Sequence, residues 1–201
     1  MKKDVYGLKQ APRTWYHRLD TYLKDKGFKR GTTDNNLYIK TEDNELLIIL
    51  VYVDDIIFGC NKDSLVQWFA SAMESEFEMS MIGELSFFLG LQITQRPEGM
   101  FISQEKYLRE MLKRFQMEDS KPVGTPMVTR CKLSKDDDSP DVDQISYRSM
   151  IGSLLYVTTS RPDIMHVVGM VGRYQAAPKQ SHLKAVKRIF RYLKETMTYG
   201  L

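Results

Sequence analysis

The fold is decided by the stretch LLIILVYVDDIIFG, residues 46–59, in which eight apolar residues run into two adjacent aspartates. The apolar run is short and rich in β-branched residues, which favours a buried strand over a helix. The triplet Ile56 to Phe58 has the same character and indicates a returning strand. Because Asp tolerates turn geometry, we expect Asp54 and Asp55 at or beside the tip of a hairpin.

Two neighbouring carboxylates on a rigid hairpin make a partial cage for a hard divalent cation. Magnesium usually takes one or two protein carboxylates together with phosphate oxygens and water. Two such ions can stabilise the attacking and leaving oxygens of a phosphoryl transfer. The residues leave one alternative open, that Asp54 and Asp55 merely form a solvated turn. A membrane-spanning segment is excluded here because the two charges interrupt the apolar run too early.

The composition predicts an intracellular, reduced protein with a real core. The chain has 201 residues, of which 42% are hydrophobic and 27% charged, enough for one large domain or two small ones. Cys60 and Cys131 form no CxxC pair, so we expect neither a disulfide framework nor a structural zinc site. No apolar signal region follows the first four residues, so we expect no secretion. Three scattered histidines are better explained by packing or surface positions than by catalysis: His17, His166 and His182.

Charge is distributed unevenly along the chain. Residues 1–30 carry 9 Lys/Arg against 3 Asp/Glu, and residues 147–201 carry 9 against 2, whereas acidic residues prevail between them. This asymmetry fits a protein whose two ends face a polyanion, although solvated helix faces would give the same pattern. The last predicted helix has a basic flank formed by Lys184, Lys187, Arg188 and Arg191. This flank fits contacts with nucleic-acid phosphates, and it fits a solvent-exposed helix face equally well.

Hydrophobic periodicity predicts alternating blocks of helix and strand. The predicted helices cover residues 12–26, 61–77, 103–115, 147–159, 163–177 and 181–197. The predicted strands cover residues 37–40, 46–53, 56–58, 85–94 and 100–103. Residues 119–145 are rich in Pro and Asp, which indicates a mobile linker between two parts of the chain.

Several short motifs occur in one fixed order along nearly the whole chain. They are YGLKQAPR at 6–13, YVDD at 52–55, GEL at 83–85, FLG at 88–90, TPM at 125–127, YRS at 147–149, GSLLY at 152–156, RPDI at 161–164 and RYL at 191–193. Each is weak alone, and the ordered set is specific. The chain resembles the reverse transcriptase region of Ty1/copia-type retrotransposon Pol polyproteins.

This resemblance implies an α+β fold, namely an incomplete polymerase palm followed by a mainly helical thumb and connection segment. The palm would be an antiparallel sheet with helices on one face. Residues 1–103 would form the partial palm with the YVDD hairpin and a primer-grip-like hairpin, and residues 104–118 a thumb-like helix. Residues 119–145 would be the linker, and residues 146–201 the helical connection-like segment.

The resemblance also assigns roles to individual residues. Asp54 and Asp55 would hold the catalytic Mg²⁺, with Mn²⁺ as an alternative ion. Tyr52 and Val53 would lie against the primer end and the incoming dNTP. The remaining residues implied to contact nucleotide, template or primer are Tyr6, Gly7, Gln10, Leu89, Gly90 and Leu91. The implied partners are an RNA or DNA template–primer and dNTP, with no membrane, in a cytoplasmic particle or the nucleus.

One departure from the family pattern concerns the third catalytic aspartate. In the family it lies on a strand upstream of the YGLK motif, where this sequence has only residues 1–5, and Asp4 is too close to Tyr6 to replace it. Losing one of three ligands loosens both metals. We therefore expect a fragment without appreciable polymerase activity by itself, with an exposed apolar sheet edge beside residues 46–53 that pairs with another chain or promotes aggregation. The alternative function is a catalytically dead nucleic-acid-binding or interaction remnant.

Overall fold

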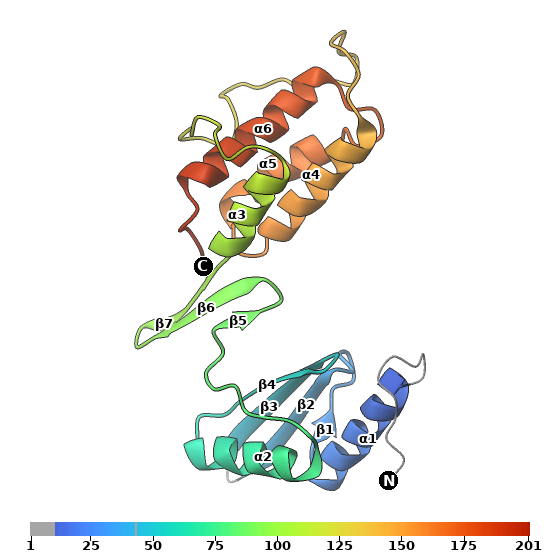
Figure 1. Cartoon of the computed structure of the whole chain (residues 1–201), viewed down its shortest axis with the longest axis vertical. Coiled ribbons are helices and arrows are strands. Elements are labelled where there is room, and N and C mark those ends of the chain that lie inside the picture. Colours follow the sequence, from blue (N-terminus) through green and yellow to red (C-terminus); the bar gives the residue numbers. More distant parts are fainter. Residues whose placement is uncertain (1–10, 43) are drawn as a thin grey trace. The chain divides into compact units, whose positions relative to one another are not determined.

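A computed structural model describes residues 11–42 and 44–201 of the chain and divides it into two compact units, Met1–Gly83 and Glu84–Leu201 (Figure 1). In the first unit the elements are α1 (Ala11–Asp25), β1 (Lys29–Arg30), β2 (Leu37–Glu42), β3 (Glu45–Tyr52), β4 (Asp55–Gly59) and α2 (Asp63–Glu76). In the second they are β5 (Phe87–Phe88), β6 (Leu91–Arg96), β7 (Gly99–Ser103), α3 (Glu105–Arg114), α4 (Gln144–Val157), the 3₁₀ turn η1 (Pro162–Ile164), α5 (Met165–Gly172) and α6 (Gln180–Glu195). The chain is thus α+β with antiparallel sheets, as predicted.

The first unit is a four-stranded antiparallel sheet in the order β1-β2-β3-β4, with α1 and α2 on one face (Figure 1). Side chains alternate along β3, so that Leu47, Ile49 and Val51 are buried against the helices. Leu46 and Ile48 point to the other face and are 45% and 41% exposed. The sheet therefore has one packed face and one open apolar face.

The predicted edge beside β3 is not where the sheet is unpaired. β3 is bonded to β2 on one side and to β4 on the other, from Ile48↔Gly59 to Tyr52↔Asp55. Among the described residues no strand pairs with the outer edge of β4. The prediction of an exposed edge next to residues 46–53 was wrong. The hairpin pairs β4 with that side of β3, so on this side the unpaired edge among the described strands is the outer edge of β4.

The second unit begins with a three-stranded sheet, β5-β6-β7. The hairpin of β6 and β7 confirms the prediction, but residues 85–94 are not one strand. Phe88 pairs with Leu91, which leaves Leu89 and Gly90 as a two-residue turn with φ of 49° and 82°. Two positive φ values are the signature of a type I′ turn, and its tight reversal splits the predicted strand in two.

The four helices of the second unit enclose a single core. Its largest fully buried members include Tyr147, Ile151, Leu154 and Phe190. The helix predicted over residues 163–177 is shorter than expected, because a 3₁₀ turn precedes α5 and turns follow its end at Gly172.

The segment 119–145, predicted as a linker between two parts, lies within the second unit. Met127 and Leu133 pack against the helical core. The carbonyl of Ser134 lies 2.8 Å from Nε2 of the buried His182, whose Nδ1 accepts a hydrogen bond from the backbone N–H of Lys179. The division between the units falls instead between residues 83 and 84.

A buried arginine ties the end of α4 to the end of α6. The Arg161 side chain is 1% exposed, and its guanidinium donates to both carboxylate oxygens of Asp163 and to the carbonyl and hydroxyl oxygens of Thr196, at 2.6–2.8 Å. The rings of Tyr192 and Tyr199 lie 5.6 and 5.4 Å from its Cζ. This cluster joins residues more than thirty positions apart in the chain.

The Asp163 carboxylate makes the stability of the second unit dependent on pH. Burial raises the pKa of Asp163, but hydrogen bonds from Arg161 and the Tyr192 hydroxyl, with the arginine charge, outweigh it and leave that pKa below its usual value. A depressed folded pKa means that the stabilisation is complete above the unfolded pKa of about 4 and is lost as pH falls through the folded value. We expect urea unfolding to show a stability gap between wild type and Asp163→Asn at pH 7 that narrows below about pH 4. An equal gap at both pH values would contradict this.

Candidate metal and nucleic-acid sites

The two aspartates lie at the tip of the β3–β4 hairpin. Tyr52 and Asp55 are the last paired residues, so Val53 and Asp54 form a two-residue turn and Asp55 begins β4. The hairpin is confirmed, but the strand predicted to end at Val53 ends one residue earlier, at Tyr52. Asp54 and Asp55 are both exposed, and Asp55 is on the same face of the sheet as Tyr52, which is 45% exposed. Because β3 is anchored by its buried face, the carboxylates emerge from a rigid support.

Sequence reasoning missed a contact between this tip and the first helix. Trp15 belongs to α1 and packs against the core of the first unit. In the structure its indole Nε1 donates a hydrogen bond to the carbonyl oxygen of Val53 at 3.2 Å. No local sequence signal indicates this bond, because 38 residues separate its partners.

The donor chemistry at the tip fits a hard divalent ion, but only as a partial site. Carboxylate oxygens are the ligands that magnesium and manganese prefer. Within residues 11–42 and 44–201 there is no group of three or more His, Cys, Asp or Glu side chains that could hold a metal. Asp54 and Asp55 therefore supply two carboxylates without a third from the described part of the chain. Tyr6, Gly7 and Gln10, predicted to contact nucleotide and template, lie outside the described residues.

Of the predicted primer-grip-like residues, Leu89 and Gly90 form the β5–β6 turn of the second unit, and Leu91 begins β6. The Tyr156 hydroxyl, from α4, donates a hydrogen bond to the carbonyl of Leu89. Tyr107 of α3 packs edge-on against the Tyr156 ring, with centroids 4.7 Å apart. A Cβ built on Gly90 would be 2.6 Å from the Tyr156 hydroxyl oxygen, so the turn and α4 are in close contact.

Three of the four predicted basic residues of α6 surround one hollow. Lys184, Arg188 and Arg191 line a pocket of about 220 Å³ together with Met127 and other residues of the preceding loop. Lys187 is exposed on the same helix but is not part of this lining.

No ion pair neutralises this pocket within the described part of the chain. None of its three basic side chains is within ion-pair distance of a described carboxylate. Arg188 is held by the Thr125 hydroxyl, which accepts a hydrogen bond from its Nη2 at 2.8 Å. The pocket is therefore a preformed concentration of positive charge.

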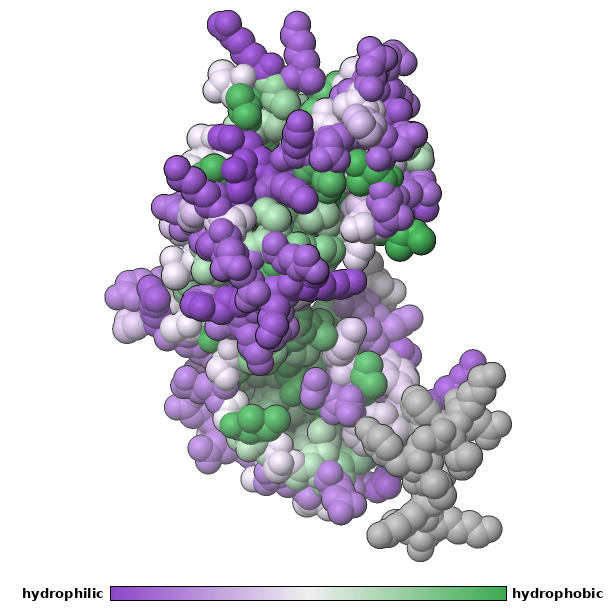
Figure 2. Space-filling model, turned by 45° about the horizontal axis from the view of Figure 1, so that its top comes forward, coloured by the Kyte–Doolittle hydropathy of each residue, from purple (hydrophilic) through white to green (hydrophobic). Residues whose placement is uncertain are grey.

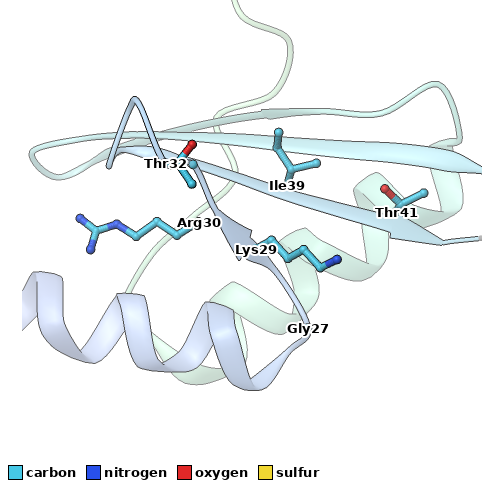
Figure 3. A pocket seen from close by; sticks show the side chains of 7 residues that line it. Gly27, Lys29, Arg30, Thr32, Ile39 and Thr41 are labelled. Carbon is cyan, nitrogen blue, oxygen red and sulfur yellow. The ribbon is translucent and has the colours of Figure 1, made fainter.

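A larger hollow of about 370 Å³ lies in the first unit and contains none of the predicted site residues (Figure 3). It is lined by Lys29, Thr32, Ile39 and Thr41, with glycines 27 and 31 and Arg30. The Arg30 guanidinium points away from Lys29 in Figure 3, and it donates to the carbonyl of Asn35 and the hydroxyl of Tyr16, both at 2.7 Å. Because the Arg30 guanidinium is bonded to Asn35 and Tyr16, few polar groups are left to bind a ligand together in this hollow.

Comparison with known proteins identifies the family. The family model described as "Reverse transcriptase (RNA-dependent DNA polymerase)" matches residues 1–129, well over half of the chain. The chain belongs to the reverse transcriptase family. This confirms the resemblance read from the ordered motifs, and the reverse transcriptase assignment covers the sequence of the first unit and of the β5–β6 turn.

Three relatives of this reverse transcriptase chain are transposon Pol polyproteins. It is 36% and 37% identical, over its full length, to the retrovirus-related Pol polyproteins from transposons RE2 and RE1 of Arabidopsis thaliana. It is 35% identical over 98% of its length to the Pol polyprotein from transposon TNT 1-94 of Nicotiana tabacum. The chain spans only 14–16% of the length of these relatives. No solved structure matches it significantly. None of the helices in the described ranges is long and apolar enough to cross a membrane.

Proposed function

We propose that this chain is a fragment of an intracellular retrotransposon RNA-directed DNA polymerase in which Asp54 and Asp55 hold a divalent metal ion. The observation that carries the proposal is the pair of exposed carboxylates at the tip of a hairpin braced by a packed sheet face. When bound, Mg²⁺ or Mn²⁺ neutralises phosphate charge and supports an in-line phosphoryl transfer. Tyr52 and Val53, exposed beside the pair, are the proposed neighbours of the primer end and the dNTP.

In this proposal the sheet β1–β4 with α1 and α2 is the palm. The turn Leu89–Gly90 with Leu91 is the primer-grip-like element, and the helices of the second unit are the thumb-like and connection-like parts that hold a template–primer duplex. The family relationship and the observed order of sheet and helices support these assignments.

The palm as described has surface that a further strand would cover. The outer edge of β4 has no described partner, and Leu46 and Ile48 expose an apolar face. Figure 2 shows hydrophobic residues, drawn green, exposed among hydrophilic ones on the surface. We infer that a strand from another segment or another chain pairs with β4 and brings the third carboxylate to the metal.

Primer extension tests the incompleteness of the site. We expect the 201-residue chain alone, with Mg²⁺ or Mn²⁺, to give no synthesis above that of its Asp54→Ala variant, because two carboxylates position the metals too loosely for phosphoryl transfer. Synthesis that depends on Asp54 would refute this and show that the described pair suffices.

The basic pocket favours a second function that does not need the aspartates, namely nucleic-acid binding. Each cation that meets a phosphate releases counterions, so affinity falls as salt rises. We expect Arg188→Gln to weaken binding to an RNA–DNA hybrid and to reduce the slope of log affinity against log salt by about 0.7–0.9. Lys187→Gln removes the same charge from the same helix outside the pocket and is expected to have a smaller effect. Equal effects would show that only net charge matters, and binding unaltered by the double Asp54→Asn/Asp55→Asn variant would separate this function from catalysis.

A further inference from the structure

The turn that presents the two aspartates has an unusual backbone. Val53, its first central residue, has φ of +56°. A β-branched residue at positive φ is a genuine outlier, and hairpin turns normally place Gly at this position. Val53 is 69% exposed, so the packing of its side chain does not enforce the conformation. The Tyr52↔Asp55 pair closes the turn, and a contact from another part of the first unit can hold it further.

Trp15 supplies such a restraint. Its indole N–H is the only donor of that side chain, and it is directed at the Val53 carbonyl oxygen. The indole is fixed by Phe77, which it meets edge-on with ring centroids 5.1 Å apart. Phe77 is 7% exposed and also meets Tyr22 edge-on at 5.3 Å. The donor is thus held by the core of the unit.

The bonded carbonyl is well placed to orient the first aspartate. The carbon and oxygen of Val53 lie in one rigid peptide plane with the nitrogen and Cα of Asp54. Fixing the direction of this carbonyl therefore fixes the plane from which the Asp54 side chain departs. Asp55 follows directly and begins β4, so the same restraint sets how the turn joins the returning strand.

We propose that Trp15 is a positioning residue for the carboxylate pair: its indole N–H holds the strained Val53–Asp54 turn and so sets the direction in which Asp54 and Asp55 present their oxygens. The inference rests on the proposed function in so far as the pair binds metal. Trp15 acts through the turn and needs no contact with metal or substrate.

The test uses Trp15→Phe, which keeps an aromatic ring against Phe77 and removes the N–H. The matched control is Trp68→Phe, the same substitution in α2 of the same unit. The Nζ of Lys40 lies 4.4 Å from the centroid of the Trp68 ring. Lys40 pairs with Leu47 of β3, which is roughly 16 Å from Tyr52 along the strand at about 3.3 Å per residue, so Trp68 lies far from the turn. The chain has two tryptophans, so each variant removes one indole signal from the NMR spectrum of the full chain and assigns both.

Two readouts decide the proposal. In Trp15→Phe the amide signals of Val53, Asp54 and Asp55 are expected to shift and to exchange faster with solvent, whereas in Trp68→Phe they stay in place. On titration with Mn²⁺, followed by broadening of these amides, Trp15→Phe is expected to raise the dissociation constant roughly tenfold, as removal of an orienting partner does at metal sites. Trp68→Phe is expected to leave it unchanged.

The outcomes separate this inference from the proposed function. Turn amides with unchanged shifts and exchange in Trp15→Phe overturn it, and so does an unchanged Mn²⁺ affinity. If wild type binds no Mn²⁺ but the turn still changes in Trp15→Phe, the metal function fails and the turn-holding role stands. If Trp15→Phe does not fold, the test is the rate at which the two indole N–H groups of the wild type exchange with solvent. The Trp15 N–H is then expected to exchange more slowly than that of Trp68, and equal rates overturn the inference.

Discussion

Arg161→Ala is expected to destabilise the second unit by about 3 kcal/mol. The substitution removes a side chain that is 1% exposed, together with its bonds to Asp163 and Thr196. Asp163 is 36% exposed, so its carboxylate regains water, and the loss falls at the lower end of the range for breaking a buried ion pair. The Thr196 carbonyl loses its charged donor in a buried position, which accounts for much of the cost.

Urea unfolding can isolate this effect because both tryptophans, Trp15 and Trp68, belong to the first unit. Tryptophan fluorescence then reports on the first unit and is expected to be unchanged, while the helical circular dichroism transition moves to lower urea. Arg109→Ala is the matched control, since Arg109 is 64% exposed in an ion pair with Glu105 of the same helix. Such a pair contributes less than about 1 kcal/mol. Equal destabilisation by the two substitutions would contradict the role of the Arg161 cluster.

Gly90→Ala is expected to destabilise the second unit by roughly 2–4 kcal/mol. The left-handed conformation at φ of 82° costs an L-residue about 1–2 kcal/mol, and the new Cβ, 2.6 Å from the Tyr156 hydroxyl oxygen, forces a rearrangement of similar cost. The hydrogen bond from Tyr156 to the Leu89 carbonyl is lost or distorted in the process.

Gly152→Ala is the matched control for this prediction. Gly152 lies within α4, and a Cβ built there meets nothing within 4 Å. Alanine is expected to stabilise this helix by about 0.5–1 kcal/mol, because glycine loses more backbone freedom on folding. Unfolding curves for the two variants should therefore shift in opposite directions. A shift of Gly90→Ala no larger than a few tenths of a kcal/mol would show that the turn adapts without strain.

Elements with a strong local pattern could be predicted from the sequence. The apolar run into Asp54 and Asp55 predicted the β3–β4 hairpin, and the helices α1, α2, α3, α4 and α6 were all expected close to their observed bounds. The paired aspartates could be identified as candidate metal ligands because adjacent carboxylates after an apolar strand have few structural uses.

Features that depend on tertiary contacts could not be predicted. Leu89 and Gly90 sit between apolar residues on both sides, so one continuous strand fitted the pattern, and only the close packing of Tyr156 marks the turn. The Pro- and Asp-rich composition of residues 119–145 indicated a loop correctly but gave no sign that Leu133 packs on the helical core. The bond from Trp15 to Val53 likewise has no signature in either segment.

Binding of Mn²⁺ to the 201-residue chain, followed by the relaxation of water protons, tests the central claim most directly. We predict that wild type binds Mn²⁺, that Asp54→Asn and Asp55→Asn each abolish this binding, and that Asp63→Asn, which removes an exposed carboxylate at the start of α2, leaves it intact. Equal Mn²⁺ binding by wild type and the Asp54→Asn and Asp55→Asn variants would contradict the assignment of the hairpin tip as the metal-holding element.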